Sequence, residues 1–115
     1  MSTKVQIEFI SGDSQKLIIT VQDADNAPAA KNLTGATITW ALARSRGSAP
    51  LITKTVGSGI TVTDAANGAL EVAIAPADTA TIDGVHYHEL EVVDSAGNKS
   101  TAVYGLVIIH PDSIP

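Results

Sequence analysis

Apolar and polar residues alternate with a period of two along most of this 115-residue chain. Successive side chains of a strand point to opposite faces of a sheet, so this alternation predicts half-buried strands. The runs lie at residues 5–9, 17–22, 36–43, 51–56, 60–63, 70–74, 89–92 and 101–109. The last run is apolar on both faces, so its register is open. We interpret residues 3–10 and 101–109 as outer strands with little of the protection, by lysines, prolines or bulges, that sheet edges usually have.

Residues suited to turns separate these runs. They lie at 23–28, 46–50, 57–59, 67–68, 83–84 and 94–98. Asn67-Gly68 predicts a type I′ hairpin turn, in which both central residues need positive φ. Only residues 76–82 have a helical pattern, of one or two turns. Seven or eight short strands with regularly spaced turns predict one β-sandwich domain over residues 1–115, with 111–115 as a frayed end.

Trp40, the only tryptophan, shares one strand face with Ile38 and Leu42. It is either a core anchor between two sheets or an exposed platform for a sugar or base. Immunoglobulin-like sandwiches bury a Trp at this place, which favours the core. We therefore predict an all-β, immunoglobulin-like antiparallel sandwich of seven to eight strands with one short helical turn. Its predicted core is Leu17, Ile19, Val21, Ile38, Trp40, Leu42, Leu70, Val72, Ile74, Leu90 and Val92.

Composition excludes several classes of function. The chain has no cysteine, so neither a disulfide framework nor a thiolate site is available. A formal net charge of −5 argues against a nucleic-acid partner. No stretch reaches the roughly 18 apolar residues needed to span a bilayer, so we expect no membrane association. The first residues alternate instead of forming an apolar run, so we expect no signal peptide and synthesis in the cytoplasm.

His86 and His88 are the candidate metal ligands, because residues two apart on a strand share a face. The nearby Glu91 has the wrong parity to complete the site. The alternative is that both histidines occupy inward or rim positions and hydrogen-bond to the backbone. Asp23 to Asn26 superficially resembles a calcium loop, but no bidentate Glu follows, so a turn is favoured.

No nucleophile elbow, P-loop or paired-carboxylate site is present in the sequence. We therefore predict no enzymatic activity, no cofactor and no resident metal. Arg44 and Arg46 flank a Gly-Ser loop and are the residues we note as able to contact a partner.

Five short motifs occur in an order that resembles a known family. They are Leu33-Thr34-Gly35-Ala36, Gly68 before a strand, Asp78-Thr79, Gly84-x-x-Tyr87 and Asp94-x-x-Gly97. Together, over roughly residues 13–110, they are similar to the N-terminal immunoglobulin-like domain of phage baseplate upper proteins and of prophage tail proteins.

The resemblance implies a non-enzymatic structural module of the virion, located in a phage tail or baseplate and made in the bacterial cytoplasm. Its implied partners are other tail or baseplate proteins, and a homo-oligomer is the further expectation from the unprotected edges. The alternative function is a carbohydrate-binding or cell-surface adhesion module, which needs exposed aromatic faces. Besides Trp40, the aromatic residues are Phe9, Tyr87 and Tyr104. In immunoglobulin domains, a Tyr hydroxyl at the corner before the sixth strand ties that strand to its loop. Either His86 or Tyr87 occupies this corner position here.

Overall fold

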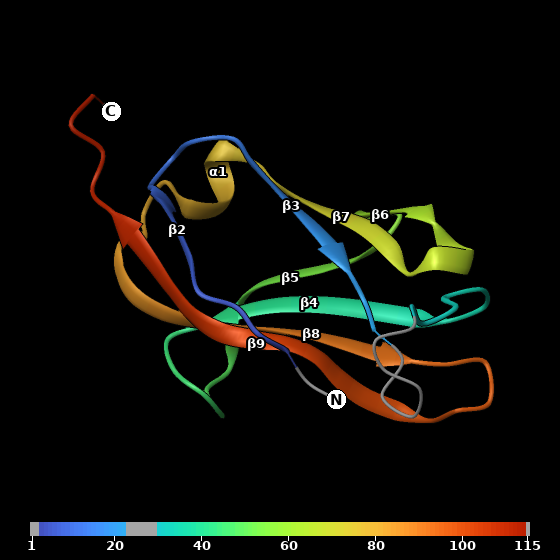
Figure 1. Ribbon diagram of the computed structural model, residues 1–115. Helices are drawn as coiled ribbons and strands as arrows, with labels where there is room; N and C mark the ends of the chain where they lie inside the picture. Colours follow the sequence, from blue (N-terminus) through green and yellow to red (C-terminus); the bar gives the residue numbers. More distant parts are fainter. Residues whose placement is uncertain (1–2, 23–29, 115) are drawn as a thin grey trace.

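The computed structural model describes residues 3–22 and 30–114. Within them lie nine strands, one short helix and one 3₁₀ turn (Figure 1). The strands are β1 (Thr3–Lys4), β2 (Ile7–Ile10), β3 (Gln15–Thr20), β4 (Thr37–Ala43), β5 (Pro50–Val56), β6 (Gly59–Asp64), β7 (Ala69–Ile74), β8 (Gly84–Val93) and β9 (Lys99–His110). The helix α1 is Pro76–Thr79, and the 3₁₀ turn η1 is Ala65–Asn67.

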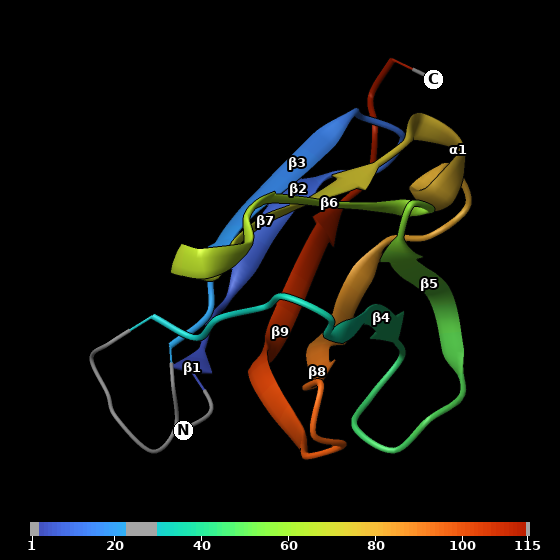
Figure 2. The same cartoon turned by 90° about the vertical axis from the view of Figure 1, so that its right-hand side faces the viewer.

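The strands form two facing layers, which Figure 2 shows edge-on. One layer has the order β9-β8-β4-β5, and the other has the order β6-β7-β3. The layers are joined where β5 meets β6. This arrangement, with a buried Trp on the central strand β4, is an immunoglobulin-like sandwich. The predicted fold class is therefore confirmed.

The first predicted run differs from expectation. It divides at residues 5–6 into β1 and β2, which both pair with β9 in parallel. A third parallel pairing joins β5 to β6, while the remaining strand pairings are antiparallel. The interpretation of 101–109 as an outer strand is wrong, because β9 has β8 on one side and β1 and β2 on the other. Only one face of β9 is buried in the core, with Val107 and Ile109, while Leu106 on the other face is exposed.

The core lies between the two layers, and most of its predicted members are confirmed. Leu17 and Ile19 are only half-buried, although both pack against the core. The buried predicted residues are Val21, Ile38, Trp40, Leu42, Leu70, Val72, Ile74, Leu90 and Val92. Sequence reasoning missed the buried residues Phe9, Leu33, Ile52, Ile60, Ala102, Val103, Val107 and Ile109. Four of these, Ala102, Val103, Val107 and Ile109, lie on β9, whose inward face is set by its register with β8.

The predicted type I′ turn at Asn67-Gly68 is wrong. A hairpin does join β6 to β7, but η1 ends at Asn67 and only Gly68 takes positive φ, at 70°. Packing against other segments requires glycine here, because a Cβ on Gly68 would lie 2.5 Å from the carbonyl oxygen of Val21. Backbone contacts with neighbouring segments thus override the local preference for the I′ turn.

The short helix α1 closes one end of the sandwich, inside the predicted range 76–82. Thr79 is fully buried. Its hydroxyl accepts a hydrogen bond from the Gly12 N–H at 2.9 Å, and its carbonyl oxygen accepts one from the Ser11 hydroxyl at 2.5 Å. Asp78 accepts from the Ala75 N–H and from Lys54 Nζ, each at 2.7 Å. No helix in the described ranges is long and apolar enough to cross a membrane.

Candidate functional site

His88 lies inside the sandwich and has a partner for each ring nitrogen. It is 1% exposed. Its Nδ1 accepts a hydrogen bond from Trp40 Nε1 at 3.1 Å, and its Nε2 lies 2.8 Å from the carbonyl oxygen of Val5. An indole N–H only donates and a carbonyl only accepts, so the imidazole is neutral with its proton on Nε2. Burial lowers the pKa of His88, against the opposing effect of the bond to Val5.

His86 is buried on the same strand face, and its Nδ1 lies 3.3 Å from the carbonyl oxygen of Gly84. The two histidines therefore satisfy separate backbone groups. Across residues 3–22 and 30–114, no three metal-ligating His, Cys, Asp or Glu side chains come together. The calcium-like stretch Asp23 to Asn26 lies outside the described residues.

On β8 and β9, the side chains that alternate with the inward-facing ones form the outer face of the sheet. Tyr87 pairs with Leu106, and Glu89 pairs with Tyr104. The Tyr87 hydroxyl donates to Glu89 Oε1 at 2.7 Å, so Tyr87 does not fill the corner position in which a Tyr ties its strand to a loop. Burial raises the pKa of Tyr87, and the bond to Glu89 adds to this effect.

The Arg46 guanidinium contacts both tyrosines. Its central carbon lies 5.2 Å from the ring centre of Tyr87 and 5.1 Å from that of Tyr104. Both distances are within the range of cation–π attraction. Tyr87 is 8% exposed although it lies on the outer face of the sheet. The guanidinium thus lies over both rings, of which Tyr87 is buried and Tyr104 half-buried.

A hollow of about 470 Å³ lies beside this arginine. We call it the basic hollow; it is lined by Lys4, Arg44, Ser45, Arg46, Val85, His86, Tyr87, Tyr104, Gly105 and Leu106. Its three cations come from β1 and from the segment after β4. No carboxylate lines it.

The cations of the basic hollow differ from the other basic residues of the chain. The chain has seven lysines and arginines. Four of them form ion pairs with described carboxylates, and they are Lys16, Lys31, Lys54 and Lys99. The remaining three, Lys4, Arg44 and Arg46, form none with the carboxylates of the described ranges. All three line the basic hollow.

Exposed apolar side chains adjoin the basic hollow on the same face. Val85 is 62% exposed and Leu106 is 45% exposed. Ile108 pairs with Val85 and is half-buried, and Ile10 extends the surface onto β2. We call Ile10, Val85, Leu106 and Ile108 the apolar strip. Sequence reasoning noted Arg44 and Arg46, but it missed their convergence with Lys4 and two tyrosines.

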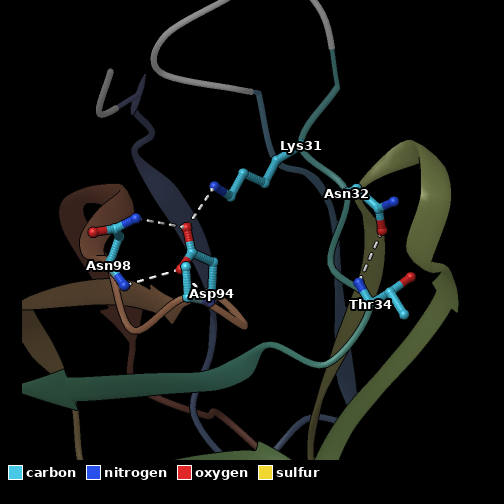
Figure 3. A network of polar contacts seen from close by, with 6 residues as sticks. Lys31, Asn32, Thr34, Asp94 and Asn98 are labelled. Atoms are coloured by element: carbon cyan, nitrogen blue, oxygen red, sulfur yellow. Dashed lines mark hydrogen bonds and ion pairs between the residues drawn. The ribbon is translucent and has the colours of Figure 1, made fainter.

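A separate polar network lies at the opposite end of the sandwich (Figure 3). Asp94, in the turn between β8 and β9, accepts from the N–H of Asn98 at 2.9 Å and from Lys31 Nζ at 3.2 Å. The bond from Asn98 is the main reason why the pKa of Asp94 is lowered. Asn32 accepts from the Thr34 N–H at 2.9 Å within the loop before β4. These bonds order the turn between β8 and β9 and the loop before β4, and they occupy both oxygens of the Asp94 carboxylate.

Comparison with protein-family models and with curated proteins found no match. Among solved structures, the chain is similar to one titled Tim-1, with a TM-score of 0.44 and 16% sequence identity. The alignment covers 100% of this chain and 99% of that one. The strand pairing and the burial pattern of the chain itself define its sandwich fold.

Proposed function

We propose that this domain is a non-enzymatic structural module of a phage or prophage tail, which assembles through protein–protein contacts. The motif resemblance over residues 13–110 supports the tail assignment. The outer face of β8 and β9 supports the protein-contact role.

The single observation that carries the proposal is the exposure of the apolar strip beside the basic hollow. Val85 and Leu106 are exposed on a face that also holds three cations without a described carboxylate partner. Contiguous apolar surface next to charged groups is typical of a protein contact site. Burying such surface contributes roughly 25 cal/mol per Å² of apolar area.

The carbohydrate-binding alternative requires aromatic faces on which sugar rings stack. Tyr87 and Tyr104 are the aromatic side chains of this face, and the Arg46 guanidinium occupies one side of each ring. Phe9 and Trp40 are buried. The arrangement of these four side chains favours a protein partner over a glycan. Saturable binding on a glycan array that Tyr87→Ala abolishes would reverse this ranking.

The proposal is tested by co-expression with the products of the neighbouring open reading frames. We expect these to encode tail, baseplate or fibre proteins, and one of them to co-purify with the domain. The double variant Val85→Asp/Leu106→Asp should abolish co-purification. The matched control Ile18→Asp should not, because Ile18 is 77% exposed but lies on β3, in the other layer. A metabolic operon around the gene, or equal capture by both variants, contradicts the proposal.

The proposal also includes self-association of the domain into a homo-oligomer. Light scattering over a concentration series tests it. A rise in mass that the Val85→Asp/Leu106→Asp variant removes is the expected result. A strict monomer would count against self-assembly but would leave docking onto a larger tail protein in place.

A further inference from the structure

We propose that the basic hollow binds an acidic segment of a partner polypeptide, whose carboxylates pair with Arg46, Arg44 and Lys4. The inference rests on the proposed function and names the partner chemistry of the same face. Three independent observations support it: the charges that line the basic hollow, the position of Arg46, and the exposed apolar residues beside it.

The charge argument starts from the balance of the whole chain. The formal net charge is −5, so acidic side chains are abundant. Nevertheless, the three cations without a described carboxylate partner come together in one hollow that no carboxylate lines. Mutual repulsion among neighbouring cations disfavours such a cluster, and an incoming anionic group relieves it. Electrostatic complementarity of this kind selects partners and speeds their association.

Arg46 is held in place before any ligand arrives. Its guanidinium is about equally distant from the ring centres of Tyr87 and Tyr104, at 5.2 and 5.1 Å. The neighbouring loop is closed by a 2.8 Å bond between the hydroxyls of Ser45 and Ser48. A guanidinium has five N–H donors in a plane and can hold a carboxylate through two of them. Because the side chain is already ordered, little conformational entropy is lost on binding.

The exposed apolar residues of the basic hollow favour a peptide over other anions. Val85 and Leu106 line the basic hollow and are both exposed. An acidic polypeptide segment with an apolar residue next to its carboxylates would cover both parts of this surface. An acidic sugar would leave Val85 and Leu106 uncovered and would compete with Arg46 for the two tyrosine rings. The observations therefore favour an acidic, partly apolar peptide.

The test is a titration of the ¹⁵N-labelled domain, followed by amide chemical shifts. The probe is a short acetylated peptide in which glutamate and leucine alternate. The matched control peptide has glutamine in place of glutamate, and a third arm uses oligogalacturonate. We expect saturable shifts with the glutamate peptide alone, centred on residues 44–46, 85–87 and 104–106. High salt should weaken the binding, because the contacts are between exposed charges.

Two variants test the assignment to Arg46. Arg46→Gln should weaken binding about tenfold, which is the loss expected for a charge-assisted hydrogen bond. Lys99→Gln is the control, because Lys99 is an exposed cation of β9 that already pairs with Glu91. It should leave the affinity unchanged. The dispersion of the amide spectrum shows whether each variant is folded.

Three results would overturn the inference. They are equal shifts with the glutamine peptide, unchanged affinity in Arg46→Gln, and binding of oligogalacturonate in place of the peptide. Each of these outcomes can occur while tail proteins still co-purify through the apolar strip. Conversely, a wild-type domain that binds the glutamate peptide but co-purifies with no tail protein would contradict the proposed function alone.

Discussion

The indole N–H of Trp40 donates a hydrogen bond to Nδ1 of His88 over 3.1 Å, in the centre of the sandwich. Both side chains are almost fully buried. The other ring nitrogen of His88 reaches the carbonyl of Val5, so one imidazole links β4, β8 and the segment between β1 and β2. The bond thus gives Trp40 both a packing role and a polar role in the core.

Trp40→Ala should lower the free energy of unfolding by about 3–5 kcal/mol, because it leaves a large cavity between the sheets. Urea unfolding followed by far-UV circular dichroism measures this loss. Ile18→Ala is the control and should cost little, since Ile18 is exposed. A loss below about 1 kcal/mol, together with an exposed-indole emission spectrum of the wild type, would contradict the buried assignment.

The stability of the fold should fall as the pH drops below about 6.5, the ordinary pKa of histidine. Burial lowers the pKa of His88 in the folded state, so the unfolded chain binds the proton more tightly. The stabilising contribution is therefore complete above the ordinary pKa and decreases as the pH falls through the folded value. Chemical unfolding at a series of pH values measures the effect.

His88→Gln removes the titrating group and should flatten this part of the pH profile. Ile18→Ala is the control and should keep the wild-type slope, because the substitution removes no titratable group and Ile18 is exposed. Identical slopes in the wild type and His88→Gln would show that His88 is not the responsible group.

Gly105→Ala should destabilise the fold by about 1–3 kcal/mol, the usual cost of overpacking. Gly105 pairs with His88, and a Cβ there would overlap the carbonyl oxygen of Val5. The substitution would thus push away the acceptor of the His88 ring. Thermal unfolding compares it with Ser100→Ala, an exposed position of the same strand. Equal midpoints for the two variants would argue against this close approach.

Asp78→Asn should lower the free energy of unfolding by about 1 kcal/mol, the usual cost of losing a side chain that accepts a hydrogen bond from a backbone N–H at the start of a helix. Burial would raise the pKa of Asp78, but the bonds from Lys54 and Ala75 outweigh it and lower the pKa. The carboxylate therefore stabilises the fold above its ordinary pKa and stops doing so as the pH falls through the lowered value. Asp64→Asn, which alters an exposed carboxylate, is the control for a urea-unfolding comparison.

The alternating pattern predicted the sandwich because parity alone decides which side of a strand is buried. It placed Trp40, Leu70 and Leu90 correctly. It could not orient residues 101–109, since both faces are apolar and only the register with β8 assigns Val107 inward and Leu106 outward.

The candidate site was predictable only in part. Arg44 and Arg46 stand out as a pair of cations in a loop. Their neighbourhood depends on long-range pairing, because Lys4 reaches the basic hollow through the parallel contact of β1 with Tyr104 on β9. No local pattern in the sequence encodes that contact. The close approach of Val5 to Gly105 depends on the same pairing.

Incorporation of the domain into phage particles tests the proposed tail role most directly. Purified particles are probed with an antibody against the domain, for the wild type, Val85→Asp/Leu106→Asp and the control Ile18→Asp. We expect the wild type and Ile18→Asp at a fixed ratio to the tail proteins, and the double variant only in the soluble fraction. Absence of the wild-type domain from intact particles, or equal incorporation of the double variant, would contradict the proposed role of this face.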